Sequence, residues 1–159
     1  MAKRRMHSVD ALMAATVTAS DTAQLIDYIK HACPHRLECC VAKTFERMLI
    51  RNSKHTLDTL RLIVSYKIRL PQDAIWMACK EAFLSGEESP QVMEVLSYLL
   101  KEGMPKSEVI SAYATARAVQ CWKVAALLEA HLNREAELQA RRIYAHLAGN
   151  DVSSKQRRM

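Results

Sequence analysis

Residues 89–105 read SPQVMEVLSYLLKEGMP and show one complete helix with a signal at each end. Ser89 is a favourable N-cap residue, and Pro90 suits the first helical position because its missing N–H has no intrahelical partner there. Gly103 fits the position just after a helix, where the backbone is often left-handed. Pro105 then opens the next helix. Apolar residues recur at spacings of three and four, as on one face of a helix: Val92, Val95, Leu96, Leu99 and Leu100.

The junction in this stretch recurs along the chain. At each junction a bulky or apolar residue ends one apolar helix and the next residue opens another. The four junctions are Cys33-Pro34, Leu70-Pro71, Met104-Pro105 and Leu132-Asn133, and their opening residues are 37, 34 and 28 residues apart. A small residue follows each opening residue by seven or eight positions, where helices can cross closely: Ala42, Ala78, Ala112 and Ala140. Periods of this size are typical of stacked helix pairs.

Composition narrows the fold class further. The 159 residues include only 3 Gly, too few for the turns of an all-β sandwich or barrel and too scattered for a phosphate-binding loop. We therefore predict an all-α fold of stacked helix-turn-helix pairs with about nine helices, in a single domain over residues 8–149. The last helix is expected to run from about Arg134 to Leu147, with Gly149 closing it.

The repeated units resemble a divergent ankyrin repeat. The segment Glu94–Gly103 (EVLSYLLKEG) matches the family's second helix, whose pattern is Glu-Val-Val-x-Leu-Leu-Leu-x-x-Gly. Asp73–Cys79 stands where the family has its Thr-Pro-Leu-His helix, Lys123–Leu128 repeats the second-helix pattern, and Asp58–Val64 repeats it more weakly. A first unit would be Asp10–Ala15 followed by Gln24–Ile29. The resemblance spans about residues 8–148 and implies a short α-solenoid.

The sequence departs from the ankyrin pattern in three ways. It has no Thr-Pro-Leu-His tetrapeptide, a single proline stands in place of the Gly-rich hairpin between units, and the loop at 84–91 is long. A tetratricopeptide or pentatricopeptide-like array would also explain the helix pairs, and so would a globular helical bundle with chance periodicity.

The resemblance implies a binding surface for another protein. First helices and inter-unit loops line the concave face of ankyrin-like stacks, and Trp76 falls on a first helix. Tryptophan is enriched at interface hot spots, although packing inside the protein would explain it equally. The predicted partner-binding residues are Trp76, Met77, Lys80, Ser111 and Thr115. The corresponding function is a non-enzymatic interaction module, either an adaptor or a delivered effector.

Charge suggests nucleic-acid binding as the alternative function. The net charge is +6, but six basic residues near the ends of the chain, in the tails at 1–7 and 150–159, account for it, because residues 6–154 hold 17 basic and 17 acidic side chains. Within the body, residues 30–69 carry +6 and residues 73–108 carry −4. Lys43, Arg47, Arg51 and Lys54 form a ridge at helical spacing that could contact phosphates, or simply a solvated face. Few aromatic residues accompany them, which weakens the nucleic-acid interpretation.

Other chemistry finds little support in the sequence. His31, Cys33, His35, Cys39 and Cys40 are zinc-ligand types, but their spacing matches no known finger, so we predict no metal and no cofactor. A Cys33–His131 enzyme lacks any residue to orient either group, and we predict no enzyme.

The sequence also gives expectations about cellular location and oligomeric state. The odd number of cysteines, 5, favours a reducing location in the cytoplasm or nucleus, or the host cytosol for a delivered effector. No apolar run is long enough to span a membrane. A dimer is conceivable, because a short solenoid has exposed apolar ends.

Overall fold

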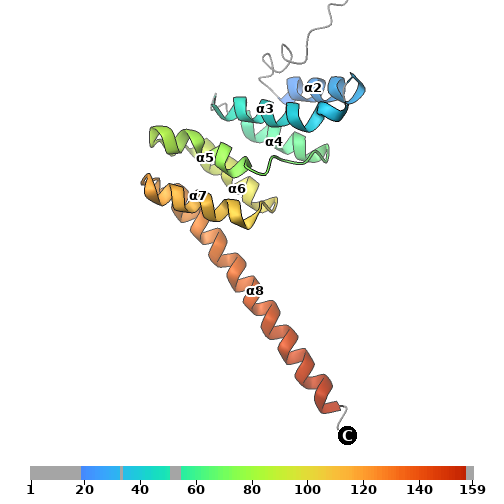
Figure 1. The fold of residues 1–159 in the computed structure, drawn as a ribbon, viewed down its shortest axis with the longest axis vertical. Helices are drawn as coiled ribbons and strands as arrows, with labels where there is room; N and C mark the ends of the chain where they lie inside the picture. Colours follow the sequence, from blue (N-terminus) through green and yellow to red (C-terminus); the bar gives the residue numbers. More distant parts are fainter. Residues whose placement is uncertain (1–18, 33, 51–54, 157–159) are drawn as a thin grey trace, which may run out of the picture.

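A computed structural model describes residues 19–32, 34–50 and 55–156, and every regular element in these ranges is helical (Figure 1). The all-α prediction is therefore confirmed. The described chain holds seven α-helices and one short 3-10 helix, η1: α2 (Ala19–Ala32), η1 (Pro34–Arg36), α3 (Leu37–Ile50), α4 (Thr56–Ser65), α5 (Ala74–Ser85), α6 (Pro90–Lys101), α7 (Lys106–Ala118) and α8 (Trp122–Gln156). Of the nine helices expected, the first, Asp10–Ala15, lies outside the described residues.

The C-terminal part of the chain differs from the prediction. We expected a junction at Leu132-Asn133 and an end at Gly149, but α8 runs without a break for 35 residues, from Trp122 to Gln156. Asparagine lacks the ring with which proline opens the other units, and the residues after it are mostly strong helix formers. Figure 1 shows α8 extending well beyond the other helices.

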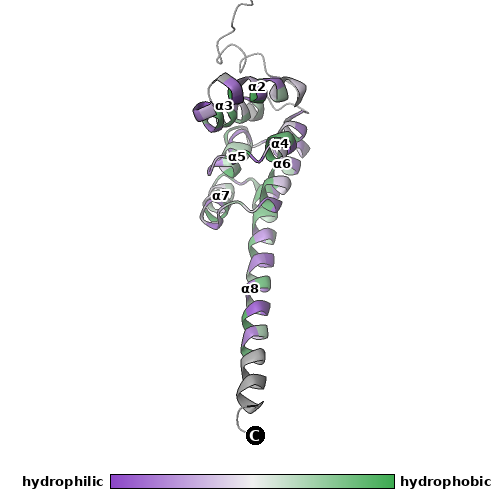
Figure 2. Ribbon diagram, turned by 90° about the vertical axis from the view of Figure 1, so that its right-hand side faces the viewer, coloured by the Kyte–Doolittle hydropathy of each residue, from purple (hydrophilic) through white to green (hydrophobic). Residues whose placement is uncertain are grey.

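The helices are arranged in two rows. In one row α3 contacts α5 and α5 contacts α7, while in the other α2 contacts α4, α4 contacts α6 and α6 contacts α8. The rows are joined by consecutive helices, because α3 also packs on α4, α5 on α6 and α7 on α8. The edge-on view in Figure 2 shows α5 and α7 on one side and α4 and α6 on the other.

Local signals set both ends of α6. The Ser89 hydroxyl accepts a hydrogen bond from the Val92 N–H at 3.3 Å, with proline at the first helical position of α6. Gly103 follows α6 with φ of +82°, a left-handed conformation that glycine adopts without a steric penalty. The three predicted end signals of α6, Ser89, Pro90 and Gly103, are therefore confirmed. Pro71 was predicted to open a helix, but α5 begins three residues later, at Ala74.

The main core lies between the two rows. It joins apolar side chains of α5, α6, α7 and the start of α8, and includes Phe45 from α3 and Leu60 from α4. Ala78 and Ala112 are buried in this core, as expected for small residues where helices cross. Ala42 is only partly buried and Ala140 is exposed, so the fourth small residue marks no crossing.

Candidate functional site

The row of α3, α5 and α7 presents a hollow between the first turns of α5 and α7. Its volume is about 370 Å³, and it is lined by Gln72, Asp73, Trp76, Pro105, Ser107, Glu108, Ser111 and Ala112. The Trp76 side chain is 41% exposed and rests against Phe83, with ring centroids 5.3 Å apart. The hollow therefore has a large aromatic wall that is held in place yet open to solvent.

Glu108 ties the two helices together beside this hollow. Its Oε1 atom accepts hydrogen bonds from the backbone N–H groups of Ile75 at 3.1 Å and Trp76 at 3.3 Å. These are among the first N–H groups of α5, which have no partner within their own helix. A carboxyl group of α7 therefore caps α5 and fixes the backbone that carries Trp76.

The environment of the Glu108 carboxyl is unfavourable to its charge. Its Oε2 atom is buried and has no hydrogen-bond partner. Burial raises the pKa of Glu108 above its ordinary value, and this outweighs the two N–H donors, which lower the pKa. Asp73, at the mouth of the hollow, adds a smaller raising effect through charge repulsion.

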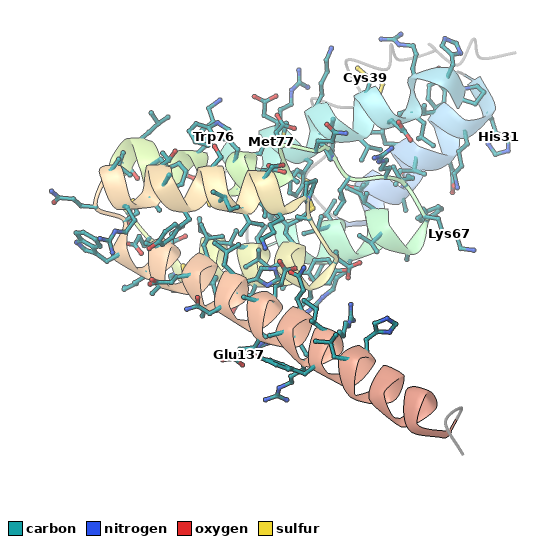
Figure 3. All side chains as sticks on the ribbon, turned by 60° about the horizontal axis from the view of Figure 1, so that its bottom comes forward. His31, Cys39, Lys67, Trp76, Met77 and Glu137 are labelled. Atoms are coloured by element: carbon teal, nitrogen blue, oxygen red, sulfur yellow. The ribbon has the colours of Figure 1, made fainter. Side chains whose placement is uncertain are left out.

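Of the five predicted partner-binding residues, only two line the hollow; Figure 3 labels Trp76 and Met77. Trp76 and Ser111 do so, whereas Met77 is partly buried and packs against the main core. The Lys80 ammonium lies 3.7 Å from a Glu46 carboxyl oxygen, which links α5 to α3. The Thr115 hydroxyl donates a hydrogen bond to the carbonyl of Ser111 at 3.1 Å.

Sequence reasoning missed Asp73 and Glu108. Asp73 immediately precedes α5 and Glu108 lies in the first turn of α7. Acidic residues are common at both places in any helix, so nothing local distinguishes the carboxyl that reaches a second helix.

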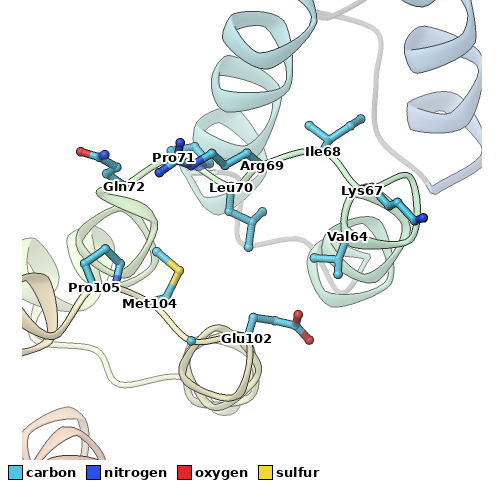
Figure 4. Close-up of a pocket in the computed structure, with 11 residues that line it drawn as sticks. Val64, Lys67, Ile68, Arg69, Leu70, Pro71, Gln72, Glu102, Met104 and Pro105 are labelled. Atoms are coloured by element: carbon cyan, nitrogen blue, oxygen red, sulfur yellow. The ribbon is translucent and has the colours of Figure 1, made fainter.

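A second hollow lies where the inter-unit connections meet. Its volume is about 370 Å³, and it is formed by residues 67–72 and 102–105 together with Val64 (Figure 4). Lys67 and Arg69 come from one connection and Glu102 from the other, so the lining has mixed charge. Two of the three junction prolines, Pro71 and Pro105, contribute to it. The two connections therefore lie close together at this hollow.

The basic ridge is described only in part. Lys43 and Arg47 lie one turn apart on α3, and both are exposed. Arg51 and Lys54 lie outside the described residues, as do the tail residues 1–7. Glu46, beside Arg47, contacts Lys80 and reduces the positive charge of this surface.

The described cysteine and histidine side chains do not converge. Among the described residues, no three His, Cys, Asp or Glu side chains gather as metal ligands would. Cys40 is buried and Cys39 is exposed, while Cys33 lies outside the described residues. His131 Nε2 lies 3.3 Å from a Glu135 carboxyl oxygen on the same helix.

The core thiols are poor nucleophiles. Burial raises the pKa of Cys79 to about 12, so the thiolate form is scarce at neutral pH. The Cys121 thiol donates a hydrogen bond to the carbonyl of Ala82 at 3.2 Å.

None of the described helices is both long enough and apolar enough to cross a membrane. No family model matches the chain, and no curated protein or solved structure is significantly similar to it.

Proposed function

We propose that this protein is a short α-solenoid of ankyrin-like helix pairs that binds another protein through the surface of α3, α5 and α7. The two rows of successive contacts support the solenoid, because each row joins helices from neighbouring units. The observation that carries the binding function is the exposed Trp76 in the hollow between α5 and α7. A rigid, partly exposed aromatic beside polar groups is a typical interface anchor.

The chemistry of the hollow supports binding rather than catalysis. Its groups are an indole, a serine hydroxyl and two carboxyls, of which Glu108 is engaged with the α5 backbone. We therefore propose an adaptor or a delivered effector without enzymatic activity. The odd number of cysteines supports a reducing location, namely the cytoplasm, the nucleus or the cytosol of a host.

A comparison of the two tryptophans tests the proposal. Partners captured from a cytosolic lysate are identified, purified and titrated against wild type, Trp76→Ala and Trp122→Ala. Trp122 is the matched control, since it is 54% exposed but lies at the start of α8, outside the hollow. We expect Trp76→Ala to weaken binding at least about 30-fold, as for an interface hot spot, and Trp122→Ala to change it less than about twofold.

A second variant tests the same hollow while leaving the Trp76 side chain in place. Ser111 is exposed, so Ser111→Arg should fold normally while filling the hollow. We expect it to block the same partner. Equal affinity of wild type, Trp76→Ala and Ser111→Arg would show that this surface is not the binding site.

Nucleic-acid binding remains the alternative function, and a single experiment distinguishes it from protein binding. Binding through the basic ridge would fall steeply with salt and with the double change Lys43→Glu and Arg47→Glu. We expect no ridge-dependent binding to single- or double-stranded nucleic acid at about 50 mM salt. Ridge-dependent binding under these conditions would favour the alternative.

A further inference from the structure

The hollow between α5 and α7, here called the α5–α7 hollow, has the composition of a site for a cationic side chain. Its lining includes the Trp76 indole and the carboxyl groups of Asp73 and Glu108, and none of its described lining residues is basic. A cation is attracted both by the face of an indole and by a carboxylate. The volume of about 370 Å³ lies near the lower end of the range for small-ligand pockets, about 300–1,000 Å³, so it suits one long side chain.

The Asp73 carboxyl is available to a ligand because Glu108 caps α5 in its place. Asp73 is the N-cap residue of α5, where an aspartate normally accepts a hydrogen bond from the helix. Its side chain makes no such bond, and Glu108 Oε1 accepts from the N–H groups of Ile75 and Trp76 instead. Asp73 is exposed, and among the residues that the structure describes it has no ion-pair partner.

The Trp76 ring also lacks the partner that other aromatic rings of this chain have. Three rings have a cation over them, with its charged group 4.4 to 6.0 Å from the ring centroid: Lys30 over Tyr66, Arg61 over Tyr98 and Arg117 over Trp122. In the described part of the chain no lysine or arginine lies over Trp76. Lys80, one turn farther along α5, instead lies 3.7 Å from a Glu46 carboxyl oxygen. The indole therefore keeps an open surface beside the Asp73 carboxyl group.

The N-terminal ends of the two helices oppose a cation only weakly. Each end carries the equivalent of about half a positive charge, and two of the N–H groups responsible at α5 are bonded to Glu108. Lys106 lies in the first turn of α7 but does not line the hollow. Residues 73–108 carry a net charge of −4, which favours the approach of a positively charged partner.

We propose that the α5–α7 hollow binds an arginine side chain of the partner protein, an inference that rests on the proposed function. The planar guanidinium stacks on the Trp76 indole and donates two parallel hydrogen bonds to the Asp73 carboxylate. The Ser111 hydroxyl, on the facing helix, is a further acceptor. We assign arginine rather than lysine, because an ammonium group has neither a plane for stacking nor paired donors.

Titration of the full chain with blocked arginine, N-acetylarginine N-methylamide, tests the site directly. The chain has 2 tryptophans, so its ¹H–¹⁵N spectrum contains two indole signals, which Trp122→Phe assigns. We expect the Trp76 signal to shift saturably in the millimolar range at low salt, and the Trp122 signal, whose ring Arg117 covers, to stay in place. Blocked citrulline has a similar shape without the charge and should bind at least about tenfold more weakly. Blocked lysine should also bind more weakly than arginine.

A carboxamide variant tests the role of Asp73. Asp73→Asn should weaken the binding of blocked arginine at least about fivefold, because it removes the charge and keeps the shape. Glu87→Gln is the matched control, since Glu87 is an exposed carboxylate of the same acidic segment outside the hollow. It should change binding less than about twofold. Circular dichroism checks that both variants keep the wild-type helix content.

Three results would overturn the arginine site. They are a Trp76 signal that does not move at about 50 mM ligand, blocked arginine binding no better than citrulline or lysine, and equal effects of Asp73→Asn and Glu87→Gln.

The captured partner separates this inference from the proposed function. Loss of partner binding in both Trp76→Ala and Asp73→Asn would support both. If Trp76→Ala weakens partner binding and Asp73→Asn leaves it unchanged, the hollow binds the partner through another group and only the arginine inference fails. If blocked arginine binds in the hollow but Trp76→Ala leaves partner binding unchanged, the proposed function fails and the arginine site is not the partner site.

Discussion

Replacing Glu108 with alanine is expected to lower the free energy of unfolding by about 2 kcal/mol. The change removes the acceptor for two N–H groups in the first turn of α5, those of Ile75 and Trp76. Each hydrogen bond contributes about 0.5–1.5 kcal/mol, which gives a range of about 1–3 kcal/mol for both. Loss of a favourable N-cap side chain costs a similar amount, about 0.5–2 kcal/mol.

Glu108→Gln separates the acceptor from the charge. The glutamine side chain keeps a carbonyl oxygen that can accept from both N–H groups, and its amide need not be ionised in a buried place. We therefore expect this variant to stay within about 1 kcal/mol of wild type at neutral pH. Urea unfolding followed by circular dichroism measures both variants, since the slope should be unchanged while the midpoint shifts.

The raised pKa of Glu108 gives these variants a definite pH dependence. Because burial raises the pKa in the folded protein, the folded state holds the proton at pH values where the unfolded chain has already released it. This group therefore contributes less to stability as the pH rises from the ordinary glutamate value through the raised one. Wild type should lose stability relative to Glu108→Gln across that interval. A Glu108→Ala loss below about 0.5 kcal/mol, or equal losses for alanine and glutamine, would refute the capping argument.

Three further predictions concern other parts of the chain. Leu96→Ala should cost about 2–5 kcal/mol in urea unfolding because Leu96 is fully buried in the main core, whereas Leu84→Ala, at an 80% exposed position, should change stability by less than about 0.5 kcal/mol. In the folded protein at pH 8, mass mapping of alkylation should show Cys39 modified quickly and Cys79 only after denaturation; early modification of Cys79 would contradict its burial. Glu88→Ala should cost about 0.5–2 kcal/mol, because Glu88 accepts a hydrogen bond at 2.9 Å from the first turn of α8; an unchanged urea midpoint would exclude this cap.

Sequence patterns predicted the elements whose signals are local. Ser89, Pro90 and Gly103 each act within a few residues, so the bounds of α6 follow from the chain alone. The carboxyl caps of Glu108 and Glu88 could not be predicted, because each reaches a helix start more than thirty residues away. Only the packed arrangement of the helices brings these groups together.

The predicted junction at Leu132-Asn133 was wrong for a different physical reason. A junction was inferred at Asn133 from its place in the repeat, although asparagine only mildly disfavours a helix interior. The following residues, which include Glu135, Ala136 and Gln139, favour a helix, and the chain continued as one. Spacing alone was therefore weaker than local propensity. Two of the five predicted partner-binding residues, Trp76 and Ser111, line one hollow. Their role in binding a partner stays a prediction.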